Sequence, residues 1–462
     1  MIETMIYHFE KLLKEDGWHT DVLIETDTLG KILAVTTNAN PSTADEVIKG
    51  ATIPGFQNAH SHAFQYAMAG LAEVHDPSHR SDNFWSWRKA MYDLALSISP
   101  DDLESIATML YAEMLNHGYT NVAEFHYVHH QQDGTQYENL SEMGERLVKA
   151  AKRVGLGITL VPIFYQKGGF GQEPQEGQRR FISSDADKYY ELLEASKRSS
   201  QSYENANIGI GIHSMRGVDP LTIKEVAQNG PQDLPFHIHI SEQLKEVEDS
   251  IAYLGKRPVE WLAENVELSD RFHLVHATHL TQEETESIAR SGANVVICPT
   301  TEGNLGDGIF PLNEYNRLKG KWSIGTDSHV SLNPLEELRL LDYGQRLISH
   351  SRLTFAGATG DSGRTAIDAA LISGRKAMNN YSQEFFSVGQ PLNSVSYSLE
   401  HPLLATASDK LLASSILYST DARANTCTIS HGKVVSKNGV HLEENSIKHA
   451  FIATMNKLGS RS

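Results

Sequence analysis

The residues best suited to chemistry are histidines and an aspartate that stand where apolar stretches of the chain end. His60 and His62 close one apolar segment as an HxH pair, and His239, His276 and Asp327 each end a later one. Histidines two apart on a strand point to the same side, so both imidazoles can face one ion. A mixed set of imidazole and carboxylate ligands suits a divalent ion such as zinc. The pattern predicts a metal-dependent hydrolase.

This interpretation competes with a simpler one, because a single histidine at a strand end is more often a hydrogen-bonded structural residue. The HxH pair after Pro-Gly, combined with the later strand ends, makes that explanation weak for the whole set. We therefore predict that a divalent ion, expected to be Zn²⁺, is bound by His60, His62, His239 and Asp327. His276 has two open roles, as a ligand or as an imidazole that orients the attacking water. We place it second to the metal, beside Asp327.

Glu242 is the candidate acid/base, because it follows His239 by three residues and lies just past the same apolar segment. A bound divalent metal lowers the pKa of its water to about 7. A nearby carboxylate can then carry the proton from the nucleophile to the leaving group. The alternative is an acidic residue at the start of the helix that follows. The predicted catalytic set is Glu242, His276 and Asp327.

These residues need a scaffold, and the chain between residues 53 and 330 repeats one unit, a short apolar strand followed by a helical pattern. The predicted strands are 53–62, 120–127, 157–165, 208–215, 236–242, 272–279, 293–301 and 322–329. Most of them begin apolar and end in polar or ionisable side chains. Eight strands alternating with helices predict an α/β fold, a (β/α)₈ TIM-type barrel with its chemistry at the C-terminal strand ends.

The two ends of the chain differ from the barrel and carry turn signals typical of hairpins, at Asp16-Gly17, Leu29-Gly30, His431-Gly432 and Asn438-Gly439. We predict a small β-sandwich domain built from both termini, residues 1–52 and 390–445. The barrel domain would then span 53–389. The last segment, 446–462, has apolar residues at helical spacing and is predicted to be a docking helix.

Composition bounds the function class. The 462 residues include two cysteines, which cannot make a disulfide framework, and the start of the chain lacks a signal-peptide layout. These features favour a cytoplasmic location. No apolar run approaches 18 residues, so no membrane span is expected. The net charge of −18 argues against nucleic acid or anionic lipid as partners.

Several segments together resemble the formimidoylglutamate deiminases of the amidohydrolase superfamily, over about residues 53–347. They are PGFQNAHSHAFQYAMAGLAE, FWSWRKAMYDLALSISP, GYTNVAEFHYVHH, EGQRRF, HIHISEQ, LVHATH, TTEGNLGDGIFP and GTDSHVSL. The resemblance implies hydrolytic deamination of N-formimidoyl-L-glutamate to N-formyl-L-glutamate and ammonia in histidine degradation, by a metal-activated water. It implies the same ligands, acid/base and assisting histidine. Relatives with two metals bridge them through a lysine on strand four, and 208–215 has no lysine, so one metal is expected.

The resemblance also implies the contacts of a small dicarboxylate substrate, at Gln65, Arg88, Tyr127, His213 and Arg216. The arginines make chemical sense, because guanidinium groups bind carboxylates through two parallel hydrogen bonds. Arginines gathered at the site of so acidic a protein would need such a reason. The alternative for each is a surface salt bridge.

Other functions remain open on the same fold. A deaminase of an aromatic base would favour stacking and amide contacts over two arginines, and release of formamide would be a different reaction on the same substrate. A metal-free relative that only assembles would have lost the ligands. Residues 166–181 are interpreted as a loop over the site, since they lack the GK[ST] of a phosphate loop. Homodimers are common among such barrels, and no interface motif is evident.

Overall fold

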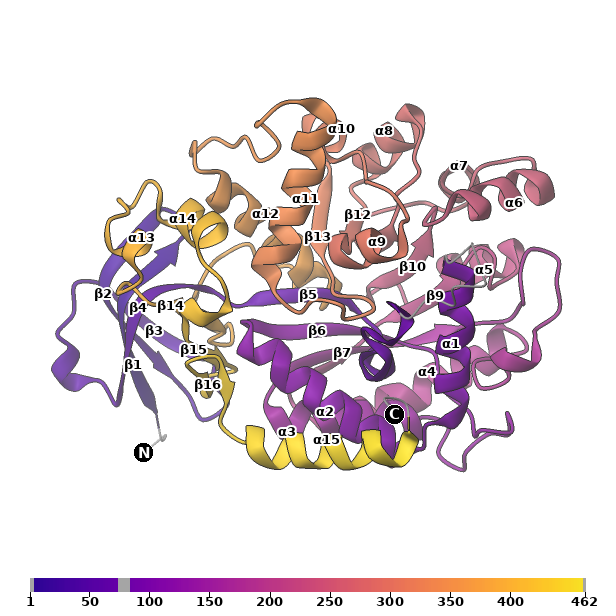
Figure 1. Ribbon diagram of the computed structural model, residues 1–462, viewed down its shortest axis with the longest axis horizontal. Coiled ribbons are helices and arrows are strands. Elements are labelled where there is room, and N and C mark those ends of the chain that lie inside the picture. Colours follow the sequence, from indigo (N-terminus) through magenta and orange to yellow (C-terminus); the bar gives the residue numbers. More distant parts are fainter. Residues whose placement is uncertain (1–3, 74–83, 460–462) are drawn as a thin grey trace.

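The computed structural model describes residues 4–73 and 84–459 (Figure 1). Eight parallel strands form a nearly closed barrel in the order β13-β12-β11-β10-β9-β7-β6-β5, with β8 pairing to β7. Their bounds are β5 Phe56–Ser61, β6 Tyr119–His126, β7 Gly157–Phe164, β8 Ala206–Ile208, β9 Ile210–Ser214, β10 Phe236–Ile240, β11 Phe272–His276, β12 Asn294–Ile297 and β13 Lys321–Ile324. The barrel fold predicted from the sequence is confirmed.

The first and last barrel strands meet at the catalytic end. Ser61 and Asp327 form a bridge, and the backbone N–H groups of Thr326 and Asp327 both donate to the His60 carbonyl at 3.1 Å. Closure therefore brings the HxH pair and the aspartate together. All eight strands end before their predicted last residues, β12 and β13 by the most. Pro299 begins helix α9 in place of the end of strand 293–301, and Asp327 adopts a left-handed backbone that stops β13.

Helices surround the barrel on its outside (Figure 1). Ser99 caps α2 through a reciprocal pair of hydrogen bonds with Asp102. The helices are α1 Phe84–Ser97, α2 Pro100–Asn116, α3 Glu142–Val154, α4 Ala186–Ser200, α5 Pro220–Asn229, α6 Leu244–Leu254, α7 Pro258–Asn265, α8 Gln282–Ser291, α9 Pro299–Leu305, α10 Leu312–Arg317, α11 Pro334–Ser349, α12 Ser362–Ala377, α13 Pro402–Ala405 and α14 Leu412–Ser419.

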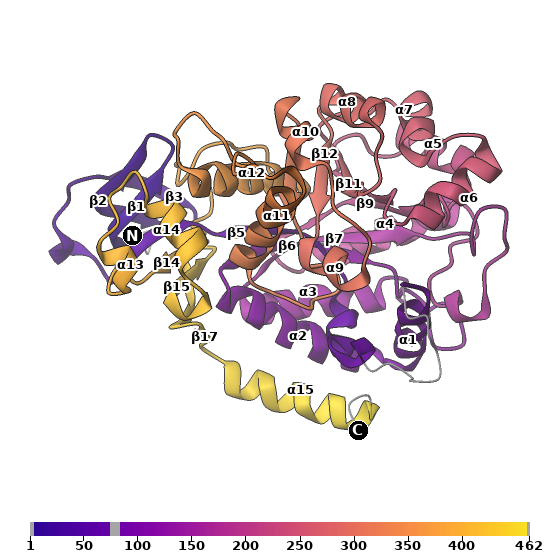
Figure 2. The ribbon, with the colours of Figure 1, turned by 45° about the horizontal axis from the view of Figure 1, so that its top comes forward.

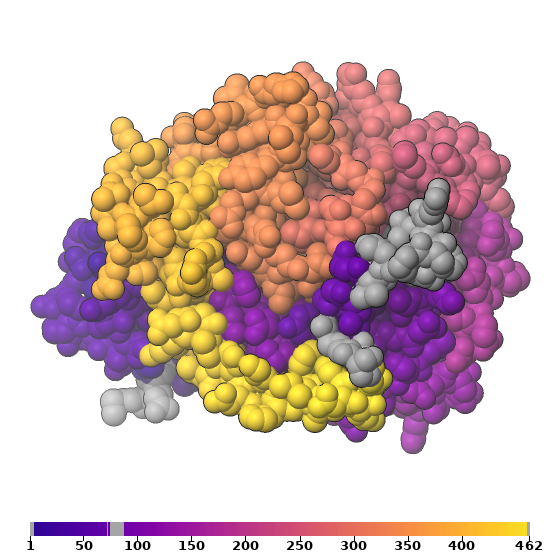
Figure 3. Space-filling model, in the orientation of Figure 1, coloured from indigo at the N-terminus to yellow at the C-terminus, as the bar shows by residue number. Residues whose placement is uncertain are grey.

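Strands from both ends of the chain form a second, mixed sheet in the order β17-β16-β15-β14-β4-β1-β2-β3. The bounds are β1 Met5–Lys14, β2 Gly17–Thr26, β3 Ile32–Thr36, β4 Glu46–Pro54, β14 Ser394–Tyr397, β15 Asn425–Ser430, β16 Lys433–Lys437 and β17 Val440–His441. Figure 3 shows indigo and orange-yellow segments side by side at the left of the molecule, and the yellow end of the chain continuing along its lower edge. The small β domain of N- and C-terminal segments is confirmed, and both residues of the His431-Gly432 and Asn438-Gly439 turns have the positive φ that tight hairpins need.

The C-terminal helix α15 Glu444–Leu458 runs along α2 rather than joining the small sheet (Figure 2). Ile447 and Met455 are its buried residues, and Lys457 bridges to Asp102 at 2.9 Å. The docking helix predicted from helical spacing is confirmed over these residues. The outer parts of the predicted terminal segments, 1–3 and 460–462, lie outside the described residues.

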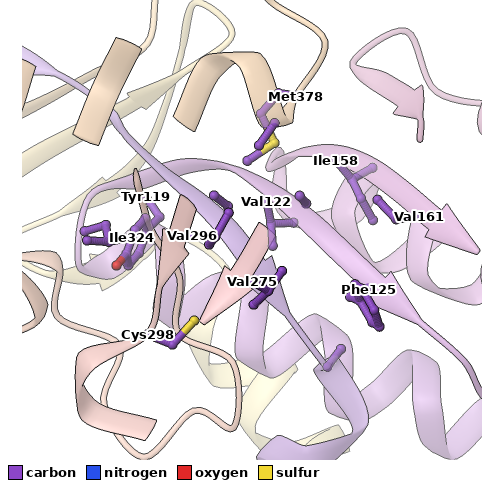
Figure 4. Close-up of a cluster of buried hydrophobic side chains, with 14 of the residues drawn as sticks. Tyr119, Val122, Phe125, Ile158, Val161, Val275, Val296, Cys298, Ile324 and Met378 are labelled. Atoms are coloured by element: carbon purple, nitrogen blue, oxygen red, sulfur yellow. The ribbon is translucent and has the colours of Figure 1, made fainter. Parts of the chain in front are cut away.

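The barrel interior is apolar below the site. Val122, Phe125, Val275 and Val296 come from three strands, β6, β11 and β12, and meet in one cluster (Figure 4). This packed apolar layer lies beneath the polar side chains at the strand ends and supports them. Among the described residues, no helix combines the length and the apolar character that crossing a bilayer requires.

Candidate active site

Three imidazoles and one carboxylate converge at the C-terminal end of the barrel. The Nε2 atom of His60 lies 3.1 Å from that of His62 and 2.9 Å from that of His239. An Asp327 oxygen lies 3.2 Å from His62 Nε2 and 3.5 Å from His60 Nε2. All four side chains are buried. Nitrogen atoms this close, with a carboxylate beside them, form a donor set that fits a tetrahedral divalent ion such as zinc.

The far sides of these rings fix which nitrogen faces the cluster. His62 Nδ1 donates to the Phe125 carbonyl at 2.8 Å, which leaves the Nε2 lone pair directed inward. Buried Glu124 accepts hydrogen bonds from Ser61 Oγ and the Ala63 N–H, both at 2.6 Å, and so holds the turn through the HxH pair. Burial raises the pKa of Glu124 to about 7.

Electrostatics favour neutral imidazoles and an ionised aspartate. Burial lowers the pKa of His60 to about 3, and it lowers the pKa of His239 well below its ordinary value. Burial opposes ionisation of Asp327 as well, but hydrogen bonds from His60 and His62 hold its pKa well below the usual range. Neutral imidazole and carboxylate are the forms in which these side chains bind metals.

The backbone is strained where the strands end at the site. Ser241, His276, Ala277 and Asp327 have φ values of 51°, 69°, 49° and 43°, in the left-handed region that L-residues seldom adopt. Such conformations persist only where the surroundings enforce them, and they gather at functional sites.

Glu242 and His276 lie beside the cluster. His276 Nε2 is 3.9 Å from a Glu242 oxygen and 3.7 Å from an Asp327 oxygen. Burial lowers the pKa of His276, but Glu242, Glu302 and Asp327 together raise it to about 10. A further group of possible donors joins His276 and Asp327 to Cys298, whose thiol pKa burial raises well above its usual value. The sequence analysis did not single out this cysteine.

All five predicted substrate contacts line one pocket together with residues of the histidine–aspartate cluster. Gln65 Nε2 donates to the Tyr127 hydroxyl at 2.9 Å, while the buried Gln65 Oε1 has no partner among the described residues. The pocket is lined by His62, Gln65, Trp87, Arg88, Met91, Tyr92, Tyr127, Tyr165, His213, Arg216, His239, Glu242, His276, Leu305 and Asp327. A larger cavity of about 300 Å³ lies between the opposite barrel end and the small sheet, and none of the predicted site residues line it.

The pocket is narrow because an ion pair crosses it. Arg216 Nη2 donates to Glu242 Oε2 at 3.1 Å, and the remaining space is about 40 Å³, room for roughly three water molecules. Arg88 and Arg216 also line a neighbouring cavity of about 380 Å³. Residues 168–175 of the predicted loop over the site contribute to its wall, and Phe170 packs on Tyr253 there. The two arginines thus stand between the outer cavity and the inner pocket.

Several functional side chains were missed from the sequence. Trp87, Met91, Tyr92 and Tyr165 line the pocket, and the aromatic residues among them had only their positions near Arg88 or at a strand end as a signal. Arg180 is fully buried. It donates to the carbonyls of Ala95 and Ile98 near the end of α1, and to that of His130 after β6, at 2.6–2.7 Å. It fastens α1, which carries Arg88, to the barrel.

Arg180 yields a stability prediction. Arg180→Met should lower the free energy of unfolding by about 3 kcal/mol, because three carbonyls lose a charged donor in a dry site. It should also raise KM, since α1 loses its attachment. Denaturant titration and steady-state kinetics measure both effects. The neighbouring, more exposed Arg179→Met is the matched control, and equal losses in the two variants would contradict the role of Arg180.

Comparison with known proteins places the chain among hydrolases. The amidohydrolase family matches residues 51–369. The formimidoylglutamate deiminase of Pseudomonas aeruginosa is 42% identical over 97% of this chain and 98% of its own length. An amidohydrolase structure from Brucella melitensis superimposes with a TM-score of 0.92 at 39% identity, covering 98% of this chain and 99% of that one. A zinc-bound adenosine deaminase from Xanthomonas campestris shares the fold, with a TM-score of 0.81 at 20% identity, covering 99% and 98%.

Proposed function

The chain belongs to the amidohydrolase family, and on that premise we propose that it hydrolyses N-formimidoyl-L-glutamate to N-formyl-L-glutamate and ammonia, a step of histidine degradation. The observation that carries the proposal is the near full-length similarity to a deiminase of that name, joined to a pocket in which two arginines face the histidine cluster. In a dicarboxylate with an amidine-like head, the carboxylates match the two arginines and the amidine-like head matches the histidine cluster.

We propose His60, His62, His239 and Asp327 as the ligands of one divalent ion, with zinc expected. The single carboxylate and three imidazoles support this choice, as does the zinc in structures of similar fold. When bound, the ion supplies an acidified water at neutral pH. Ligation by His276 or Cys298 is the competing arrangement.

Glu242 is the proposed proton carrier. It takes one proton from water as the water oxygen bonds to the formimidoyl carbon, and gives it to the nitrogen that leaves. The second proton, from the hydroxyl formed in this way, follows to the same nitrogen by way of Glu242. The carbon–nitrogen bond then breaks, releasing ammonia and leaving the formyl group on glutamate. His276 faces Glu242 and Asp327 and is proposed to orient the attacking water. Asp327 is proposed to accept a hydrogen bond from the same attacking water.

Arg88 and Arg216 are the proposed carboxylate partners, and Gln65, Tyr127 and His213 complete the pocket. Because Arg216 is paired with Glu242, a substrate carboxylate that binds Arg216 replaces Glu242 as its partner. The exchange opens the narrow pocket and frees the acid/base at the moment of binding. Orientation by two fixed guanidinium groups supplies part of the rate.

Arg88→Gln tests the carboxylate contacts. The loss of one charged hydrogen-bond donor, about 1.5–3 kcal/mol, should raise KM by about 10- to 100-fold, with little change in unfolding temperature. Steady-state kinetics check this. Lys89→Gln, at the exposed neighbouring position on α1, is the control and should behave as the unmodified protein. A KM that stays constant in Arg88→Gln would exclude it from substrate binding.

The experiment that tests the function is product analysis after incubation of the zinc-loaded protein with formimidoylglutamate. Equal amounts of ammonia and N-formylglutamate are expected. Glutamate with formamide would keep the substrate and change the bond that is cleaved. No turnover in the presence of metal would direct the search to aromatic bases, the substrates named for more distant relatives such as the 8-oxoguanine deaminase of P. aeruginosa, 26% identical over 64% of each chain.

Three finer features are proposed alongside the function. The domain division is 1–52 with 390–445, then 53–389, then 446–462. A cytoplasmic location accords with two unpaired, buried cysteines. A homodimer is proposed as the assembly, and sedimentation velocity tests it.

A further inference from the structure

We infer that Glu302 is a positioning residue that fixes the tautomer and orientation of His276, an inference that rests on the proposed function. Glu302 lies in the first turn of α9 and is 4% exposed. Its Oε1 atom is 3.3 Å from His276 Nδ1, on the side of the ring opposite the pocket. His276 Nε2 faces Glu242 and Asp327.

The hydrogen bonds determine which ring nitrogen carries the proton. The same Glu302 Oε1 accepts the backbone N–H of Cys298 at 3.0 Å, so this oxygen acts as an acceptor. Its partner His276 Nδ1 must therefore donate. The ring then presents Nε2 to the pocket, on the side where Glu242 and Asp327 lie. A ring free to flip or to change tautomer would present the wrong atom for part of the time.

The strained backbone makes a second support for the ring necessary. His276 and Ala277 both have positive φ, at the end of β11 where the ladder to β12 has already stopped. Strand pairing therefore holds His276 on one side only, through Ile240 of β10, and leaves the β12 side without a strand partner among the described residues. The carboxylate of Glu302, anchored through Cys298 on the next strand end, takes over that role. Ligand-orienting carboxylates of this kind typically change activity or affinity by about 10- to 100-fold when removed.

A purely structural role is the alternative, because Glu302 also caps α9 through the Cys298 N–H. The chain provides a matched control for it. Glu337 is equally buried and accepts the N–H and hydroxyl of Thr300 in the same turn of α9. No hydrogen bond or ion pair described for Glu337 involves a residue of the pocket. Loss of capping alone should therefore affect Glu302 and Glu337 variants alike.

The test compares Glu302→Leu, Glu302→Gln and Glu337→Gln in the zinc-loaded protein. Glu302→Leu, which loses the acceptor, should lower kcat about 100-fold with little change in KM. Glu302→Gln, which retains an acceptor oxygen, should recover most of that loss, to about 10-fold below the unmodified protein. Glu337→Gln should lower stability and leave kcat within about twofold.

A spectroscopic readout separates this inference from the proposed function. Nitrogen–proton correlation spectra of histidine-labelled protein, with His276 assigned by difference from His276→Asn, report the tautomer without any substrate. The unmodified protein should show the Nδ1–H form, and both Glu302 variants should show less of it. An unchanged tautomer and a kcat at the unmodified level in Glu302→Gln would overturn the inference, even if Glu302→Leu does not fold. A tautomer shift in a protein that does not hydrolyse formimidoylglutamate would preserve it and reject the proposed function.

Discussion

Replacing Glu242 with glutamine is expected to lower kcat by about 10²- to 10⁴-fold while the bound metal remains. The amide cannot take up the proton that leaves the attacking water, and general acid–base groups contribute rate factors of this size. The side chain keeps its length, so its contact with Arg216 can persist and KM should change much less than kcat. Single-turnover kinetics with metal analysis on the same sample measure both quantities.

The control for this experiment is Glu248→Gln, an exposed carboxylate on α6, six residues further along the chain. It should match the unmodified protein in rate and metal content. A Glu242→Gln variant with near-normal turnover would remove Glu242 from the mechanism. A variant that has lost its metal would instead assign Glu242 to the ligand set.

The second large effect is expected from His239→Asn, which should abolish both metal binding and turnover. Its Nε2 lies 2.9 Å from that of His60, in the middle of the proposed donor set. Loss of one of four ligands should weaken metal affinity by on the order of 10²-fold or more, since changes to surrounding residues alone cost 10- to 100-fold. Elemental analysis after gel filtration measures the metal bound per chain.

His237 offers a matched control on the same strand. It precedes His239 by two residues, is fully buried, and stacks on His273 with ring centres 4.8 Å apart, at the far end of β10. His237→Asn should retain the metal and lose about 1–3 kcal/mol of stability. Equal metal contents in the two variants would show that His239 is not a ligand.

Most of what could be predicted from the sequence came from the residues at the ends of the strands. An apolar run that ends near His60, His239 or His276 predicts a strand. It also indicates which end of that strand carries functional side chains, because barrel chemistry gathers at C-terminal strand ends. The eight strands and the convergence of the proposed ligands follow from that rule, whereas the small sheet follows from the turn signals near both termini. Exact strand ends do not, since the left-handed turn at Asp327 depends on the closing contact with β5.

The roles of individual buried charges were the part that could not be predicted. Arg180, Glu124 and Glu302 look like ordinary surface residues in a linear sequence. Their partners, among them Ala95, Ser61 and His276, lie 26 to 85 positions away along the chain. Their roles exist only once distant segments are packed together. Such residues are recognised from the buried polar groups that they pair with, and these pairs are visible only in the structure.

The path of β4 has a consequence for how the protein is made. β4 lies in the small sheet between β1 and β14 and leads, through Gly55, straight into the strand that bears His60. β14 is not synthesised until more than 330 residues after β4. Throughout that interval β4 has one edge without its partner, a form in which strands readily pair with other chains. Completion of the small sheet is therefore among the last events of biosynthesis, and the nascent chain is most prone to aggregation just before it.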